Sequence, residues 1–164
     1  ALEDGMAGGE GEGRTVSLSV PGHTLGHMAF HFPNGGALFT ADSLMALGCG
    51  RVFEGTMEQM HASLQKLAAL PPETMVYSGH EYTTSNARFA LTVDPDNAAL
   101  HERVKKVAAM REAGEPTAQV SLAEELATNP FLRASDAGIR ATLGMEDATD
   151  AEVFAEIRRR KDAF

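Results

Sequence analysis

The sequence predicts a mixed α/β (α+β) fold, because strand-like segments fill its first half and helical patterns fill its second. Apolar residues make up 43% of the 164 residues, which is enough for a core of ordinary size. Three residues of metal-binding type, His23, Asp42 and His80, each follow a strand-like run. We therefore expect the ends of the sheet strands to present these side chains to one cleft.

Four strands and one long helix are predicted in the first half. The strands lie at residues 15–20, 28–32, 37–40 and 74–77, and a Pro-Asn-Gly-Gly turn joins the second to the third. A Gly- and Glu-rich loop at 2–14 precedes them. The helix covers 57–70, with Thr56 as its N-cap and Pro71-Pro72 as its stop.

Beyond residue 84 the pattern is helical, with breaks at Asp94-Pro95, Gly114-Glu115-Pro116 and Asn129-Pro130. Helices are predicted at residues 97–112, 121–127 and 148–161, the last two capped by Ser121 and Thr149. We accordingly predict two domains, 1–83 with the sheet and 84–164 all-helical.

The charge and cysteine content exclude several classes of protein. A net charge of -9, from 14 basic and 23 acidic residues, argues against nucleic acid or an anionic membrane as a partner. No apolar run reaches the roughly 18 to 20 residues that span a bilayer, and no signal peptide opens the chain. The single cysteine, Cys49, fits a reducing compartment, so a cytoplasmic location is expected.

The three ligand-type residues are interpreted as part of a metal site. Imidazole nitrogens and carboxylate oxygens are the usual ligands of catalytic zinc, and the two oxygens of Asp42 could bridge two ions. Taken alone, His23 would be an ordinary turn histidine, but it stands in a Pro-Gly-His-Thr run.

The remaining reactive side chains receive structural interpretations. His27 is expected to support the site rather than bind metal, and the other histidines, His31, His61 and His101, to be structural or solvated. Cys49 lacks an accompanying general base and is read as a packing residue. The basic run at 158–161 has a second interpretation as a solvated helix end.

Several longer motifs carry a family resemblance. They are Leu47-Gly48-Cys49-Gly50-Arg51-Val52-Phe53-Glu54-Gly55-Thr56, Gly79-His80-Glu81-Tyr82-Thr83, Gly114-Glu115-Pro116-Thr117, Asn129-Pro130-Phe131-Leu132-Arg133 and a terminal Arg-Lys-Asp-x-Phe. With them the chain resembles the C-terminal two-thirds of hydroxyacylglutathione hydrolases, or glyoxalase II, in the metallo-β-lactamase superfamily. The resemblance implies a partial metallo-β-lactamase αββα sandwich followed by a helical glutathione-binding domain.

The resemblance also implies an activity and a site. The expected reaction is metal-dependent hydrolysis of S-lactoylglutathione to glutathione and D-lactate, or of another S-2-hydroxyacylglutathione to glutathione and the corresponding 2-hydroxy acid. Two divalent ions are implied, zinc first and iron or manganese as alternatives, with His23 on one ion, His80 on the other and Asp42 bridging them as the catalytic ligand. The implied glutathione-binding residues are Arg51, Phe53, Tyr82, Arg158 and Lys161.

Two departures from the family pattern shape the expectation. Phe53 stands where many relatives have Tyr, so one hydroxyl contact to glutathione is missing. The family's Thr-His-x-His-x-Asp-His metal motif is absent, and the start at Ala1 suggests a fragment of a longer polypeptide. The N-terminal half of the same fold is then the expected partner, and the isolated chain should bind metal weakly, turn over little and expose the sheet surface that this half covers.

Two other interpretations stay open. The chain could be a noncatalytic fragment that binds glutathione or a protein partner. It could also belong to another metallo-β-lactamase-fold hydrolase or a persulfide dioxygenase, although those relatives generally lack a long helical C-terminal segment.

Overall fold

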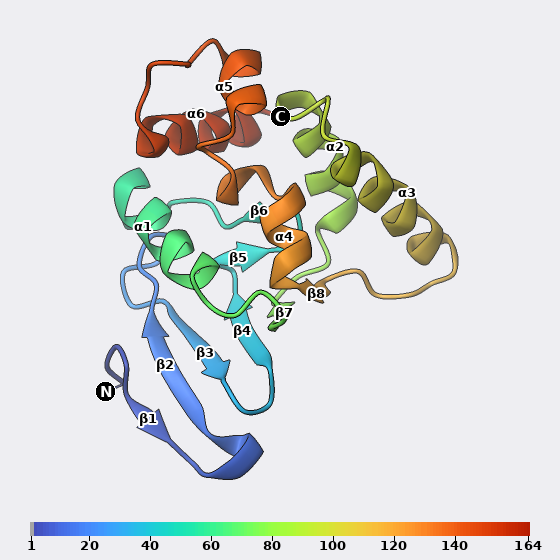
Figure 1. Cartoon of the computed structure of the whole chain (residues 1–164). Coiled ribbons are helices and arrows are strands. Elements are labelled where there is room, and N and C mark those ends of the chain that lie inside the picture. The colour runs from blue at the N-terminus through green and yellow to red at the C-terminus, as the bar shows by residue number, and fades with distance from the viewer. Residues whose placement is uncertain (1) are drawn as a thin grey trace.

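The computed structural model describes residues 2–164; Ala1, the first residue of the predicted domain 1–83, lies outside them. A six-stranded sheet has the order β1-β2-β3-β4-β7-β8, in which β4 and β7 are parallel and all other neighbours antiparallel. Its strands are β1 (Ala7–Gly8), β2 (Thr15–Ser19), β3 (Met28–Phe32), β4 (Ala37–Ala41), β7 (Met75–Ser78) and β8 (Gln119–Ser121). Figure 1 shows this sheet at one end of the molecule and the C-terminal helices at the other.

The four predicted strands and the first predicted helix are confirmed within one or two residues. Helix α1 (Met57–Ala68) connects the parallel strands β4 and β7. Thr56 caps it in a full capping box, because the Thr56 hydroxyl accepts from the Gln59 amide and the Gln59 side chain accepts from the Thr56 amide. Met60, Leu64 and Leu67, the predicted stripe, are fully buried.

The second half contains five helices, of which three were placed individually by the sequence. The helices are α2 (Thr83–Val93), α3 (Ala98–Glu112), α4 (Leu122–Thr128), α5 (Ala137–Leu143) and α6 (Asp150–Ala163). The caps of α4 and α6 are Ser121 and Thr149, as predicted, and Thr149 forms a reciprocal capping box with Glu152. Sequence periodicity gave no separate start for α2 or α5.

One prediction for the second half is wrong. Residues beyond 84 are not all helical, because β8 pairs with β7 through Val120 opposite Val76 and so extends the sheet. A three-residue strand is too short to show a period of two, which explains why the pattern missed it. The short hairpin β5 (Leu44–Met45) and β6 (Gly48–Cys49) was missed for the same reason.

The larger of two hydrophobic clusters joins the sheet to the helical half. Val20, Ala29, Leu38 and Val76 project from one face of the sheet into the same buried cluster as residues of α1, α2 and α6. The opposite face carries a row of aromatic side chains, in which Phe39 contacts Phe32 and stacks on Tyr77 at 5.0 Å. Phe39 is 46% exposed and Met75 37%, so the predicted open sheet surface is present.

Among residues 2–164, none of the helices is both long enough and apolar enough to cross a lipid bilayer.

Acidification below about pH 6.5 is expected to destabilise the fold through His31 and His61. Burial lowers the pKa of both imidazoles, and for His61 it outweighs the opposite effect of Asp150. The unfolded chain then binds more protons, so stability is fully present above the unfolded pKa of about 6.5 and is lost as pH falls. Urea unfolding at pH 7.5 and 5.5 measures this loss.

His61→Gln should reduce that pH dependence, because the ring of His61 lies 5.4 Å from Phe154 and its Nε2 is buried without a hydrogen-bond partner in the described chain. His101, exposed on α3, provides the matched control His101→Gln. Equal pH dependence in both variants would show that His61 is not responsible.

Candidate metal centre and substrate pocket

His23 is presented by the turn that follows β2. Gly22 has φ +148°, and a Cβ there would lie 2.5 Å from Met60 Sδ, so the turn requires glycine. The ring of His23 is oriented by the carbonyl oxygen of Arg51, 2.8 Å from Nδ1. Because a carbonyl can only accept, Nδ1 carries a proton, and Nε2 is the nitrogen that faces Asp42.

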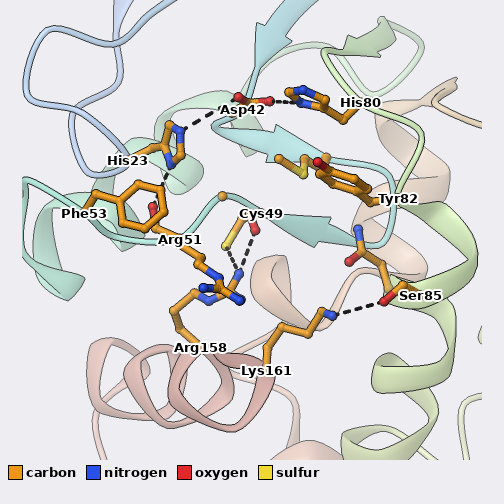
Figure 2. Close-up of a pocket in the computed structure, with 13 residues that line it drawn as sticks. His23, Asp42, Cys49, Arg51, Phe53, His80, Tyr82, Ser85, Arg158 and Lys161 are labelled. Carbon is orange, nitrogen blue, oxygen red and sulfur yellow. Dashed lines mark hydrogen bonds and ion pairs between the residues drawn. The ribbon is translucent and has the colours of Figure 1, made fainter. Parts of the chain in front are cut away.

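Asp42 lies between the two predicted histidine ligands (Figure 2). Its Oδ2 is 3.8 Å from Nε2 of His23, and its Oδ1 accepts a 2.5 Å hydrogen bond from Nδ1 of His80. Each carboxylate oxygen thus serves a different imidazole. This arrangement suits a carboxylate that bridges two ions.

His80 follows β7 and is supported by its two successors in the chain. Tyr82 stacks on the imidazole with ring centroids 5.1 Å apart and planes 5° from parallel. The Glu81 carboxylate accepts from the backbone amide of Thr117 at 2.9 Å and from the hydroxyls of Thr117 and Thr83. Burial raises the pKa of Glu81, but these hydrogen bonds outweigh it and leave the pKa below its ordinary value.

A cavity of about 400 Å³ extends from these ligands to the basic end of α6. All eight site residues predicted from the sequence line it: His23, Asp42, Arg51, Phe53, His80, Tyr82, Arg158 and Lys161. Figure 2 shows the histidines and Asp42 at one end and the cationic side chains at the other. The residues of both predicted domains therefore form one pocket.

The two basic residues of α6 are held differently. Arg158 is 4% exposed, donates to the carbonyl oxygen of Cys49 at 2.6 Å and lies over the ring of Phe131. Lys161 lies 3.4 Å from the hydroxyl of Ser85. Burial, followed by the charges of Arg158 and Arg51, lowers the pKa of Lys161. The alternative of a merely solvated helix end does not describe Arg158, which is buried.

Cys49 behaves as a packing residue in this pocket. Burial raises the pKa of its thiol to about 11 despite the nearby Arg158 guanidinium. The thiol is therefore protonated at neutral pH and is a poor nucleophile.

The remaining histidines lie apart from the pocket or beside it. His27 packs edge-on against His23 at 5.7 Å, with its Nε2 3.3 Å from the carbonyl oxygen of Thr40, as expected of a supporting residue. His31 is buried on β3, His61 is partly buried on α1, and His101 bonds to the Pro95 carbonyl oxygen. Within residues 2–164, His, Cys, Asp and Glu form no group of three or more that could hold an ion.

Sequence reasoning missed the buried polar residues that hold the pocket wall. Glu125 accepts from the backbone amide of Leu47, at 3.1 Å, and Asn129 donates to the carbonyl oxygens of Met45 and Gly48 at 3.2 and 3.0 Å. These contacts fix the turn of the β5–β6 hairpin, where Leu47 has φ +57°. Asn129 belonged to a recognised motif, but no sequence pattern gave Glu125 or Asn129 a role.

Gly50→Ala is expected to lower the free energy of unfolding by about 1–3 kcal/mol, the usual cost of overpacking. A Cβ at Gly50 would lie 2.0 Å from the carbonyl oxygen of Asp42 and 3.0 Å from Nδ1 of His23. Urea denaturation measures the loss. Gly26→Ala is the control, since a Cβ at Gly26 meets nothing within 4 Å; equal losses in the two variants would contradict the steric account.

Family profiles match the two parts of the chain. The profile described as "Hydroxyacylglutathione hydrolase C-terminus" matches residues 81–164, and that of the "Metallo-beta-lactamase superfamily" matches residues 1–80. Curated relatives named hydroxyacylglutathione hydrolase are 62% identical over 95% of this chain in Cereibacter sphaeroides strain ATCC 17029 and 65% identical over 90% in Ruegeria pomeroyi. The chain spans only 60% and 58% of these two relatives.

Solved structures agree on the fold. ETHE1 from Myxococcus xanthus matches 96% of this chain, and 50% of its own, with a TM-score of 0.60 at 24% identity. A structure of TTHA1623 "in a di-iron-bound form" matches 80% of this chain, and 47% of its own, with a TM-score of 0.52 at 29% identity. The metallo-β-lactamase fold predicted from the sequence is confirmed.

Proposed function

Because the chain belongs to the hydroxyacylglutathione hydrolase family, we propose that it contributes to a thioester hydrolase. It would form the pocket for the thiol part of the substrate and part of the metal centre. The proposed reaction hydrolyses S-2-hydroxyacylglutathione to glutathione and a 2-hydroxy acid; the main substrate, S-lactoylglutathione, gives D-lactate. The observation that carries the proposal is one cavity lined from both parts of the chain. Its possible metal ligands come from the first part, and its cationic side chains come from both.

Family membership implies divalent metal binding, and we propose two ions, with zinc expected first and iron or manganese as alternatives. The TTHA1623 structure is described as di-iron-bound. The residues fit such a centre in part: His23 would bind one ion, His80 the other, and Asp42 would bridge them. A bound divalent ion lowers the pKa of water and polarises a carbonyl group.

The metal-ligand side chains in this chain do not complete the coordination shell of either ion. Three side chains shared by two ions give about two protein ligands each, below the three that catalytic zinc sites use. We therefore propose that the remaining ligands come from polypeptide outside this sequence.

The cationic end of the pocket is proposed to bind the glutathione part. Arg51, Arg158 and Lys161 supply positive charge for its two carboxylates. Tyr82 and Phe53 would contact the same moiety, and Phe53 lacks the hydroxyl of tyrosine. In the reaction water adds to the thioester carbonyl carbon, the carbon–sulfur bond breaks, and glutathione leaves as a thiolate that needs little acid assistance.

The exposed aromatic face of the sheet is an argument for a protein partner. Phe39 and Met75 leave apolar surface in contact with water, which favours burial against another apolar layer. About 40% of the length of the C. sphaeroides relative lies outside its match to this chain. We propose that the corresponding N-terminal part of the same fold covers this face and brings the missing ligands. A cytoplasmic location is proposed with it, from the single reduced cysteine.

Thiol release from S-lactoylglutathione tests the function. The chain would be mixed with zinc and with the segment of the R. pomeroyi relative that lies outside the match. Hydrolysis in the mixture, with little from either part alone, is the expected result. No hydrolysis by a mixture that forms a complex would contradict the proposal.

The incomplete ligand set also favours a second function, a noncatalytic fragment that binds glutathione or a partner. Glutathione binding without hydrolysis in the complex would support it. Another hydrolase of the superfamily is less favoured, because the hydroxyacylglutathione hydrolase C-terminal profile matches residues 81–164.

A further inference from the structure

Asp162, in the last turn of α6, lies between two of the pocket arginines. Its Oδ1 accepts from Nε and Nη2 of Arg158, at 3.0 and 2.8 Å, and lies 3.7 Å from Nε of Arg51. The residues that line the cavity include both arginines but not Asp162. The carboxylate, 37% exposed, thus lies outside the cavity and beside two cations of what we call the cationic wall: Arg51, Arg158 and Lys161.

Two of the three cations of this wall differ in how far their side chains are exposed. The Arg158 side chain is 4% exposed and uses its remaining contacts on Cys49 and Phe131, so its position is fixed. The Arg51 side chain is 62% exposed, and its only ion pair in the described chain is the 3.7 Å contact to Asp162. Asp162 is therefore the acid shared by a buried and an exposed guanidinium.

We infer that Asp162 is the internal counter-ion of the cationic wall: it positions Arg158 and, at the same time, weakens the binding of carboxylate ligands in the pocket. This inference rests on the proposed function, in which the wall binds the carboxylates of glutathione. A carboxylate that enters the cavity is attracted by three cations and repelled by the carboxylate of Asp162. The two effects of Asp162 therefore act in opposite directions on ligand affinity.

Asp162→Asn separates these effects, because asparagine keeps an oxygen that accepts from Arg158 but carries no charge. S-methylglutathione, which cannot be hydrolysed, would be titrated into the chain by calorimetry. Affinity should rise about three- to tenfold, the effect of one charge at a distance of several ångströms in a partly solvated site. The gain should shrink in high salt.

Stability provides the readout that excludes a merely structural role. Arg158 is buried and would lose its counter-ion, so the urea midpoint of Asp162→Asn should fall while its affinity rises. A residue that only maintained the fold would lower both together. A pH titration of Lys161 by carbon-detected NMR gives a readout that needs no ligand. Asp162 raises the pKa of Lys161, so this pKa should be lower in Asp162→Asn than in wild type.

Glu156→Gln is the matched control. Glu156 lies on the same helix, pairs with two arginines, Arg159 and Arg160, at 2.9 and 2.8 Å, and is not part of the cavity. The control removes the same charge from the chain and should leave S-methylglutathione affinity unchanged. An equal gain in both variants would reveal a general charge effect and overturn the inference.

The failures of the inference and of the proposed function are distinguishable. If wild type binds S-methylglutathione and Asp162→Asn binds it equally or more weakly, the inference alone is wrong. If neither protein binds it, both the inference and the proposed glutathione site are wrong.

Discussion

Replacing Asp42 with alanine should reduce thioester hydrolysis by at least about a hundredfold in the complex of this chain with the proposed N-terminal part of the fold. Groups that merely support a metal ligand already cost 10- to 100-fold in metal affinity or activity when removed, so a bridging ligand should cost at least as much. The structure gives Asp42 this importance because its two oxygens face two different histidines. Initial rates of thiol release, together with the zinc content of the purified complex, measure both effects.

Asp147→Ala is the control for that experiment, because Asp147 is exposed and lies in the loop before α6. Its activity and metal content should match those of wild type. Normal zinc content and normal hydrolysis in Asp42→Ala would contradict the assignment of Asp42 as the ligand that bridges two metal ions.

The largest effect on stability is expected from Glu125→Ala, which should lower the free energy of unfolding by about 3–5 kcal/mol. Glu125 is fully buried and forms an ion pair with Arg103, whose side chain is only 3% exposed. Asn129 also donates to this carboxylate, at 2.9 Å. Alanine would leave the Arg103 guanidinium buried without its acid and the Leu47 amide without an acceptor, and both omissions are costly.

Glu124→Ala provides the comparison on the same helix. Glu124 is partly exposed and lies 3.9 Å from Arg103 and 3.7 Å from Lys106, so its removal should cost less than about 1 kcal/mol. Urea denaturation of the two variants gives the difference directly. Similar losses for Glu124→Ala and Glu125→Ala would show that burial of the ion pair has no special weight.

Replacing the whole pair tests the same point from the other side. A double variant, Arg103→Leu with Glu125→Leu, should recover part of the stability that Glu125→Ala loses, because apolar residues of similar volume leave no unpaired charge. A double variant as unstable as Glu125→Ala would instead assign the loss to the Leu47 and Asn129 contacts.

The elements that were predicted from the sequence are those with a regular period and a clear cap. Helix α1 shows both, with its buried stripe at Met60, Leu64 and Leu67 and its cap at Thr56. Strand β8 and the β5–β6 hairpin have two or three residues per strand, fewer than a periodic pattern needs. Their positions depend on partners distant in the chain, such as Val76 opposite Val120.

The site residues that stand in recognisable motifs were predictable from the sequence. Those whose role depends on burial or on packing in the folded chain were not. The strand-end pattern identified His23, Asp42 and His80, the resemblance added the residues proposed to bind glutathione, and the structure brings them all to one pocket. Glu125 looks like an ordinary surface acid in the sequence, and Asp162 stands in the terminal Arg-Lys-Asp-x-Phe motif, where no role was predicted for it. Their importance comes from packing: one is buried against Arg103, and the other lies between two arginines.

The location of the metal tests the central claim most directly. Crystals of the complex of this chain with the proposed N-terminal part of the fold, grown with zinc, would be measured on both sides of the zinc absorption edge. We predict anomalous peaks beside Asp42, one coordinated by His23 and one by His80. Zinc peaks elsewhere in the complex, with none at these three side chains, would contradict the account.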